Sequence, residues 1–178
     1  MLRKLTYEEI QHGRPEPEET LKQPRYPIVV IADNIRSLHN VGALFRTADG
    51  AHIEHLYLCG ITAKPPRSEI RKTSLGAEES VPWTYVEEAA RLIQELKEKG
   101  YQIVMLEHTS NSLNYQTAGY RFPLCLVVGN EYHGIQEHLV PLGDMAVEIP
   151  MYGIKQSLNV SVAFGIALYE ILGHQKAL

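Results

Sequence analysis

Three polar segments could bind a ligand or carry chemistry, and each follows an apolar run typical of a β-strand. The first, which includes Asn34, Asn40 and Arg46, follows IVVIAD at the point where open α/β sheets place their ligands. The second, VVGNEYHG, has glycines on both sides of Glu131, which suits backbone approach to a ligand with an acid held beside it. The third, IPMYGIKQSLNVS, gathers small and polar residues before a long apolar stretch.

Each segment also has a structural explanation when it is taken alone. Asn40 could cap a helix that begins at Val41, with Gly42 present for close packing, and Ser157 could cap the last helix. The segment around Glu131 could be an ordinary loop. The third segment is harder to explain in this way, because a helix apolar on nearly every side is unusual when it opens with SLNVS. Its N-terminus is therefore expected to face a ligand or a deep chain crossing.

Several common enzyme signatures are absent from the sequence. No G-x-G-x-x-G follows the first strand, and there is no Walker A sequence, no G-x-S-x-G and no H-E-x-x-H. A standard dinucleotide enzyme, P-loop enzyme, serine hydrolase or zincin is therefore disfavoured. The eight histidines are scattered, so no metal site is expected.

Strands and helices alternate along the chain, which indicates an α/β domain with a mostly parallel sheet. The apolar runs predict strands over residues 28–33, 55–60, 101–108, 124–130 and 145–150. Helical spacing predicts helices over 41–50, 87–99 and 159–172, with a short helix within 133–140. The last of the long helices is apolar nearly all round and is expected to be buried on more than one side.

Composition indicates one domain, at residues 28–178, preceded by an N-terminal arm at residues 1–27 that is rich in proline and charge. Cys59 and Cys125 lie in strand-like runs and are expected to be reduced core thiols. No signal peptide or membrane span is seen, which predicts a cytoplasmic protein with no membrane partner. The net charge of −4 argues against a generally basic nucleic-acid binder, although KPPRSEIRK (64–72) carries four cations.

The three segments, in this order and separation, resemble the three motifs of the TrmH (SpoU) family in the SPOUT superfamily. N-x-G-x-x-x-R corresponds to Asn40, Gly42 and Arg46. G-x-E-x-x-G corresponds to Gly129, Glu131 and Gly134, and the tail IPM…SLNVSVA completes the set. One short motif would occur by chance, but three together are highly specific. The resemblance extends from about residue 27 to residue 172.

This resemblance implies a SPOUT-type α/β knot, a mostly parallel sheet flanked by helices with a C-terminal trefoil knot formed by the second and third motifs. It implies S-adenosylmethionine as cofactor and a homodimer with the final helix in the interface, which would cover that helix's second apolar face. The expected cofactor-binding residues are Gly129, Asn130, Glu131, Gly134, Ile149, Met151, Ser157, Leu158 and Asn159.

The resemblance further implies methyl transfer from S-adenosylmethionine to a ribose 2′-hydroxyl of tRNA or rRNA, with tRNA favoured. Arg46 is the matched catalytic position. Because guanidinium stays protonated in proteins, Arg46 is expected to grip a phosphate and stabilise developing oxyanion character rather than act as a base. Asn40 and Asn159 are expected to fix the hydroxyl and the loop geometry, and Ser157 to hold the knot loop.

Two functions stay open for Glu131: it could orient Arg46 or lie near the sulfonium, or it could satisfy loop amides. His133 fills a variable position of its motif, so the family pattern does not require it as a general base. RNA capture is expected to involve Arg46 and the basic cluster, defined as Lys64, Arg67, Arg71 and Lys72.

The main alternative is a non-catalytic RNA-binding or regulatory protein of the same fold. The presence of all the expected catalytic residues, Arg46, Asn40, Glu131, Ser157 and Asn159, argues against it.

Overall fold

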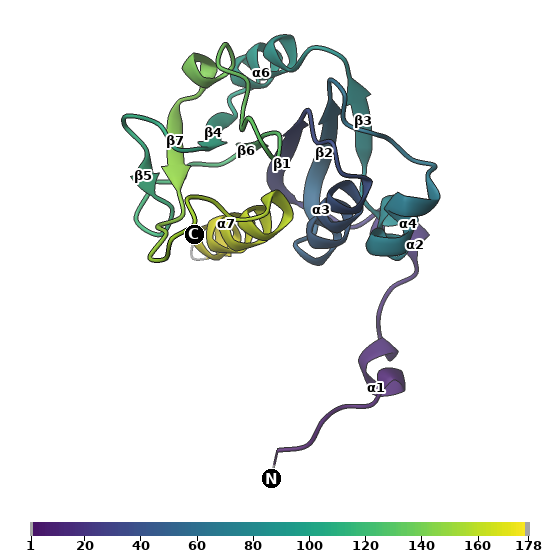
Figure 1. Ribbon diagram of the computed structural model, residues 1–178. Helices are drawn as coiled ribbons and strands as arrows, with labels where there is room; N and C mark the ends of the chain where they lie inside the picture. Colours follow the sequence, from purple (N-terminus) through teal and green to yellow (C-terminus); the bar gives the residue numbers. More distant parts are fainter. Residues whose placement is uncertain (1, 177–178) are drawn as a thin grey trace.

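The fold is a seven-stranded sheet with helices on both faces, seen in a computed structural model that describes residues 2–176 (Figure 1). The strand order is β3-β2-β1-β6-β4-β7-β5, and all of the paired strands are parallel. The predicted α/β class with a mostly parallel sheet is therefore confirmed. The strands are β1 (Tyr26–Asp33), β2 (Ile53–Cys59), β3 (Trp83–Val86), β4 (Gln102–Leu106), β5 (Leu113–Asn114), β6 (Leu124–Val128) and β7 (Met145–Glu148).

The sheet separates two hydrophobic cores, which explains the continuous apolar sequence of its central strands. Along β1, Val30 packs into one core and Ile31 into the other, since successive side chains of a strand point to opposite faces. Helix α6 (Ala89–Glu98) covers one face. The other face is covered by α3 (Leu38–Gly50), α4 (Ser68–Ser74), α5 (Ala77–Ser80) and α7 (Val160–Lys176). Cys59 and Cys125 are buried free thiols, as expected.

The strand order brings distant segments to one edge of the sheet. Strand β6 lies between β1 and β4, and β7 lies between β4 and β5, so the later strands are inserted among the earlier ones. Because all these strands are parallel, the loops after β1, β4, β6 and β7 meet at their shared carboxyl edge. The trefoil knot itself stays a prediction.

Two predicted helix starts and one predicted short helix differ from the structure, and hydrogen bonds explain each difference. Helix α3 begins at Leu38 rather than Val41, because Ser37 is its N-cap and accepts a hydrogen bond from the amide of Asn40. Helix α7 begins at Val160, and the side chain of Asn159, not Ser157, accepts from the amide of Ser161. Residues 133–139 form turns, followed only by a 3-10 turn at Val140–Leu142, because side chains from elsewhere take the backbone donors of this segment.

Six short elements were not predicted: β3, β5, α4, α5 and, within the arm, α1 (Tyr7–Gln11) and α2 (Pro17–Thr20). Half of the predicted basic loop is thus helix α4, which packs on α3. Gly42 allows this contact, since a Cβ there would lie 2.0 Å from the hydroxyl of Thr73 and 2.3 Å from the carbonyl oxygen of Ile70. The expected close packing at Gly42 is confirmed. Strands β4, β6 and β7 end two residues earlier than predicted, where the chain turns toward the site.

Helix α6 matches its prediction closely, while α7 departs from it. Ala89, Leu92, Ile93 and Leu96 line the buried face of α6 as predicted. In α7 one face is buried, but Val162 and Tyr169 on other faces are 50% and 52% exposed in the single chain. Burial of α7 on more than one side is therefore not found here. Within residues 2–176, no helix is both long and apolar enough to cross a membrane.

Candidate active site

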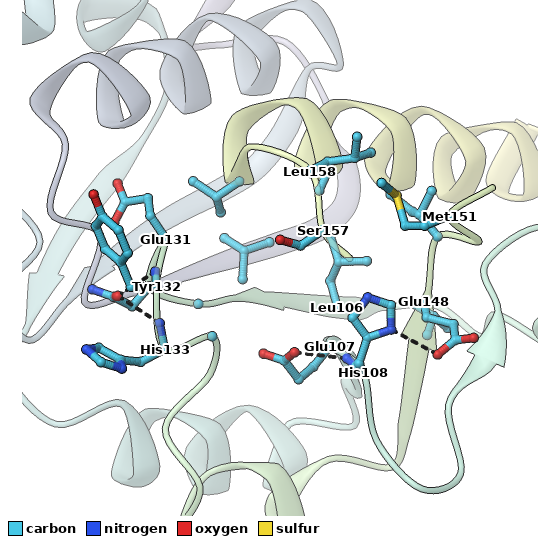
Figure 2. Close-up of a pocket in the computed structure, with 18 residues that line it drawn as sticks. Leu106, Glu107, His108, Glu131, Tyr132, His133, Glu148, Met151, Ser157 and Leu158 are labelled. Carbon is cyan, nitrogen blue, oxygen red and sulfur yellow. Dashed lines mark hydrogen bonds and ion pairs between the residues drawn. The ribbon is translucent and has the colours of Figure 1, made fainter. Parts of the chain in front are cut away.

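A cavity opens at the carboxyl ends of the adjacent strands β6, β4 and β7 (Figure 2). Its walls come from the loop after β6, the first residues after β4, the segment after β7 and the start of α7. They are Leu106, Glu107, His108, Val128, Gly129, Asn130, Glu131, Tyr132, His133, Gly134, Val147, Glu148, Ile149, Met151, Ser157, Leu158, Val160 and Ala163. All of the predicted cofactor-binding residues line this cavity except Asn159.

The loop after β6 is built around two glycines and one asparagine. Asn130 and Gly134 exchange backbone hydrogen bonds of 2.9 Å, and Gly134 adopts a left-handed φ of 67°. The side chain of Asn130 accepts from the amides of Tyr132 and His133. A Cβ on Gly129 would lie 2.1 Å from the nitrogen of Ile135, so only glycine fits there. The loop therefore has a fixed backbone at the cavity wall.

Glu131 joins the first and second motifs. Its carboxylate accepts hydrogen bonds from the amides of Arg36 and Ser37, each at 2.9 Å, and from the side-chain amide of Asn40 at 2.8 Å. Burial opposes its ionisation, but these three donors outweigh that effect and lower the pKa of Glu131. This geometry favours the loop-amide function of Glu131 over an orienting contact with Arg46.

A chain of hydrogen bonds extends from Glu131 to the third motif. Asn40 is buried, and its side-chain oxygen accepts from Asn159 at 3.1 Å. Asn159 in turn accepts from the amide and hydroxyl of Ser161. Glu131, Asn40 and Asn159 thus tie the three motifs together, so Asn159 supports the cavity wall without being part of it. For Ser157, which lines the cavity, a loop-holding function stays a prediction.

We expect Glu131→Gln to lower the free energy of unfolding at pH 7 by about 1–3 kcal/mol, because an amide cannot accept all three hydrogen bonds. The folded-state pKa is lowered, so the stabilisation is present above the pKa of an unfolded glutamate and lost as pH falls through the folded-state pKa. The difference from the unsubstituted protein should therefore shrink as pH drops below about 4. Urea unfolding across pH measures it.

Glu98→Gln is the matched control, since Glu98 is exposed on α6. A constant difference between Glu131→Gln and the unsubstituted protein from pH 7 to pH 3 would contradict the ionised network.

Acidic and imidazole side chains directly after β4 and at the end of β7 were not predicted as site residues. Glu107 accepts from the amides of Ile135 and His108, at 2.8 and 2.9 Å. The His108 ring lies 3.1 Å from both Glu148 and the carbonyl oxygen of Gln156, so it links β7 to the loop that lines the cavity. Hydrogen bonds from Ser112 and His108 lower the pKa of Glu148. The one available signal was position: each residue lies near the end of a predicted strand, where the apolar run gives way to polar residues.

A buried acid at the end of β1 was also missed. Asp33 is fully buried and accepts from the backbone and side-chain amides of Gln136, which fixes the loop after β6 against β1. Burial raises the pKa of Asp33 despite these hydrogen bonds. Its signal in the sequence is an acid that ends an apolar strand.

The predicted RNA-binding residues lie outside the cavity. Arg46 is exposed on α3 and is not part of the cavity wall. All four residues of the basic cluster are exposed. Arg71 forms a surface ion pair with Glu79 at 3.3 Å, and the ammonium of Lys64 lies 4.3 Å from the ring centroid of Tyr85. Among residues 2–176, no group of three or more His, Cys, Asp or Glu side chains is arranged to hold a metal ion.

Comparison with known proteins places the chain in one family. The model of the SpoU rRNA Methylase family matches residues 27–169, which include all three motifs. The chain belongs to this family. The resemblance seen in the sequence, and with it the expectation of a methyltransferase of this family, is confirmed.

Individual relatives within the SpoU family agree with this assignment. The chain is 37% identical over 155 residues to the tRNA (guanosine(18)-2′-O)-methyltransferase of Aquifex aeolicus, covering 85% of this chain and 72% of the relative. The crystal structure of the A. aeolicus TrmH/SpoU tRNA modifying enzyme has a TM-score of 0.80 at 35% identity, over 90% of this chain and 81% of that one.

A structure of an rRNA methyltransferase from Sinorhizobium meliloti with bound AdoMet has a TM-score of 0.79 at 29% identity. It covers 90% of this chain and 61% of the other, so that relative extends well beyond the SpoU domain described above.

Proposed function

We propose that this protein transfers a methyl group from S-adenosylmethionine to a ribose 2′-hydroxyl of tRNA or rRNA, with tRNA the first class to test. The observation that carries the proposal is the hydrogen-bonded chain Glu131–Asn40–Asn159, which joins all three family motifs beside one cavity. The A. aeolicus relative is a tRNA (guanosine(18)-2′-O)-methyltransferase and the S. meliloti relative is an rRNA methyltransferase, and both activities support the proposal.

The cavity has the chemistry that S-adenosylmethionine requires. Apolar side chains such as Ile149 and Leu158 can hold an adenine ring, and the carboxylates of Glu107 and Glu148 suit the positive groups of the cofactor. Backbone groups around Gly129 are accessible because that residue has no side chain. When bound there, the cofactor would supply an electrophilic methyl group on its sulfonium.

The residues of the chain then have to align the hydroxyl and ease loss of its proton, since a ribose hydroxyl is a poor nucleophile at neutral pH. Arg46 is exposed and free to take a phosphate of the RNA, and its charge would stabilise the developing oxyanion. Asn40 and Asn159 fix the first and third motifs relative to each other, which the hydrogen bond between their side chains supports.

We further propose a homodimer that uses the exposed side of α7. Val162 and Tyr169 are half exposed, and Tyr152 and Ile154 in the preceding loop are 95% and 98% exposed. Large apolar side chains left open in this way favour a second copy as the partner. Arg46 adjoins Thr47, which lies against α7, so the dimer seam would run beside the catalytic position. Sedimentation equilibrium tests this: a monomer at micromolar concentration would contradict it.

Tritiated methyl transfer to total tRNA and total rRNA, followed by mapping of the modified nucleotide, tests the activity. We expect label on a ribose 2′-oxygen. Calorimetric binding of S-adenosylmethionine without transfer to either RNA would instead favour a regulatory protein of this fold.

The basic cluster should supply part of the RNA affinity. We expect combined replacement of Lys64, Arg67, Arg71 and Lys72 by alanine to weaken binding and flatten its salt dependence, because each phosphate contact releases counterions. Filter binding of bulk tRNA at salt concentrations from about 50 to 300 mM, where the affinity falls steeply, measures the slope of log Kd against log salt. An unchanged slope of log Kd against log salt would show that the basic cluster does not contact the RNA.

A further inference from the structure

One end of the cavity carries an exposed aromatic ring and an exposed guanidinium in contact with each other. Tyr132 lines the cavity beside Glu131 and His133, at the end away from Met151 and Glu148 (Figure 2). The guanidinium carbon of Arg36 lies 5.5 Å from the centroid of the Tyr132 ring. Tyr132 is nevertheless 78% exposed, so most of its surface is open.

The backbone under both side chains is fixed. The amide of Tyr132 donates to the side chain of Asn130, within the turn that Gly134 closes. The amide of Arg36 donates to Glu131 at 2.9 Å. The ring and the guanidinium are therefore presented from rigid loops, which lowers the entropy that a ligand must overcome on binding.

Arg36 has charge available for an anion. It is exposed, and within residues 2–176 no carboxylate forms an ion pair with it. Its charge is not needed by Glu131, which uses only its main-chain amide. A cation and an exposed aromatic ring side by side are the pair that single-stranded nucleic acid recognises, through phosphate contact and base stacking.

We propose that Arg36 and Tyr132 form a nucleotide platform, in which a base of the RNA stacks on the Tyr132 ring and Arg36 contacts a neighbouring phosphate. This inference rests on the proposed function, because the acceptor nucleotide must reach the rim of the cavity that holds the methyl donor. The base is the target nucleotide or one next to it. The platform thus positions the substrate and does not take part in the chemical step.

The two side chains have separable signatures in methyl transfer to bulk tRNA and rRNA. Tyr132→Ala should raise KM for RNA by about 5- to 100-fold with a smaller change in kcat, since base stacking on an aromatic ring is lost. Tyr132→Phe keeps the ring and should stay within about twofold. Arg36→Ala should reduce the slope of log Kd against log salt by about one, while Tyr132→Ala leaves the slope unchanged.

Arg91→Ala is the matched control for charge, because Arg91 lies on α6, away from the cavity, in a surface ion pair with Glu95. Calorimetry with S-adenosylmethionine separates the ligands. A Tyr132→Ala variant that loses cofactor affinity but keeps its KM for RNA would overturn the platform and assign the ring to the cofactor.

An active protein whose Tyr132→Ala and Arg36→Ala variants keep the original KM and salt slope would also overturn the inference. Failure of the unsubstituted protein to methylate any RNA would instead contradict the proposed function itself. In that case filter binding with tRNA still tests the platform through the salt slope.

Discussion

Arg46→Ala is expected to reduce kcat for RNA methylation by about 10²- to 10³-fold, the cost of losing one preorganised charge at a developing oxyanion. Arg46 is exposed and lies outside the cavity proposed to bind the cofactor, so cofactor affinity and melting temperature should barely change. Tritiated methyl transfer at saturating cofactor measures kcat, and calorimetry measures the Kd for S-adenosylmethionine. A matched loss of cofactor affinity would assign Arg46 to the cofactor site instead.

Arg46→Lys refines this result. A lysine keeps the charge but lacks the planar fork that binds a phosphate through two parallel hydrogen bonds. We expect RNA binding to persist while most of the turnover is lost. Nearly full turnover in Arg46→Lys would show that a point charge suffices. It would contradict the expectation that Arg46 positions a phosphate through two parallel hydrogen bonds. Arg91→Ala on α6 should retain full activity and controls for loss of surface charge.

Gly129→Ala is expected to have the second large effect, through the cavity proposed to bind the cofactor. A Cβ at Gly129 would lie 2.1 Å from the nitrogen of Ile135, and 2.2 and 2.5 Å from the carbonyl carbon and oxygen of Gly134. All three are backbone atoms of the same tight loop, so no side-chain rotation relieves the clash. We expect overpacking at Gly129 to weaken the affinity for S-adenosylmethionine by about tenfold or more. We also expect the free energy of unfolding to fall by about 1–3 kcal/mol.

Gly119→Ala controls for the substitution itself, since a Cβ there meets nothing within 4 Å. Calorimetry and thermal unfolding should find it close to the unsubstituted protein. Cofactor binding by Gly129→Ala equal to that of the control would mean that the loop can move without cost, and would argue against a preformed cradle.

Local patterns in the sequence were enough for the sheet and for most of the residues that line the cavity. The apolar strand runs, the amphipathic spacing of α6 and the glycines at 129 and 134 each report on their own few residues. The predicted wall residues follow from these patterns and from the family motifs, because glycine permits close backbone approach whatever the rest of the fold. The same holds for Gly42, whose missing side chain permits the contact with α4.

Other features depend on which strands become neighbours, and that is settled by packing over long sequence distances. Because β4 lies between β6 and β7, the site also contains Glu107, His108 and Glu148. The contacts of Asn40 cross 91 residues to Glu131 and 119 to Asn159, so the choice between a capping and a linking function was not local. The short helices α4 and α5 form against α3 rather than by their own propensity.

The sequence alone therefore determined the family, the parallel α/β sheet and the glycine-containing loop at the cavity, since these rest on residue type and short spacing. Only the tertiary structure decided that Glu131 binds loop amides and that Arg46 lies outside the cavity. It also placed Arg36 against Tyr132. The physical reason is the same in each case: these contacts join segments that meet only when the strands have taken their order in the sheet.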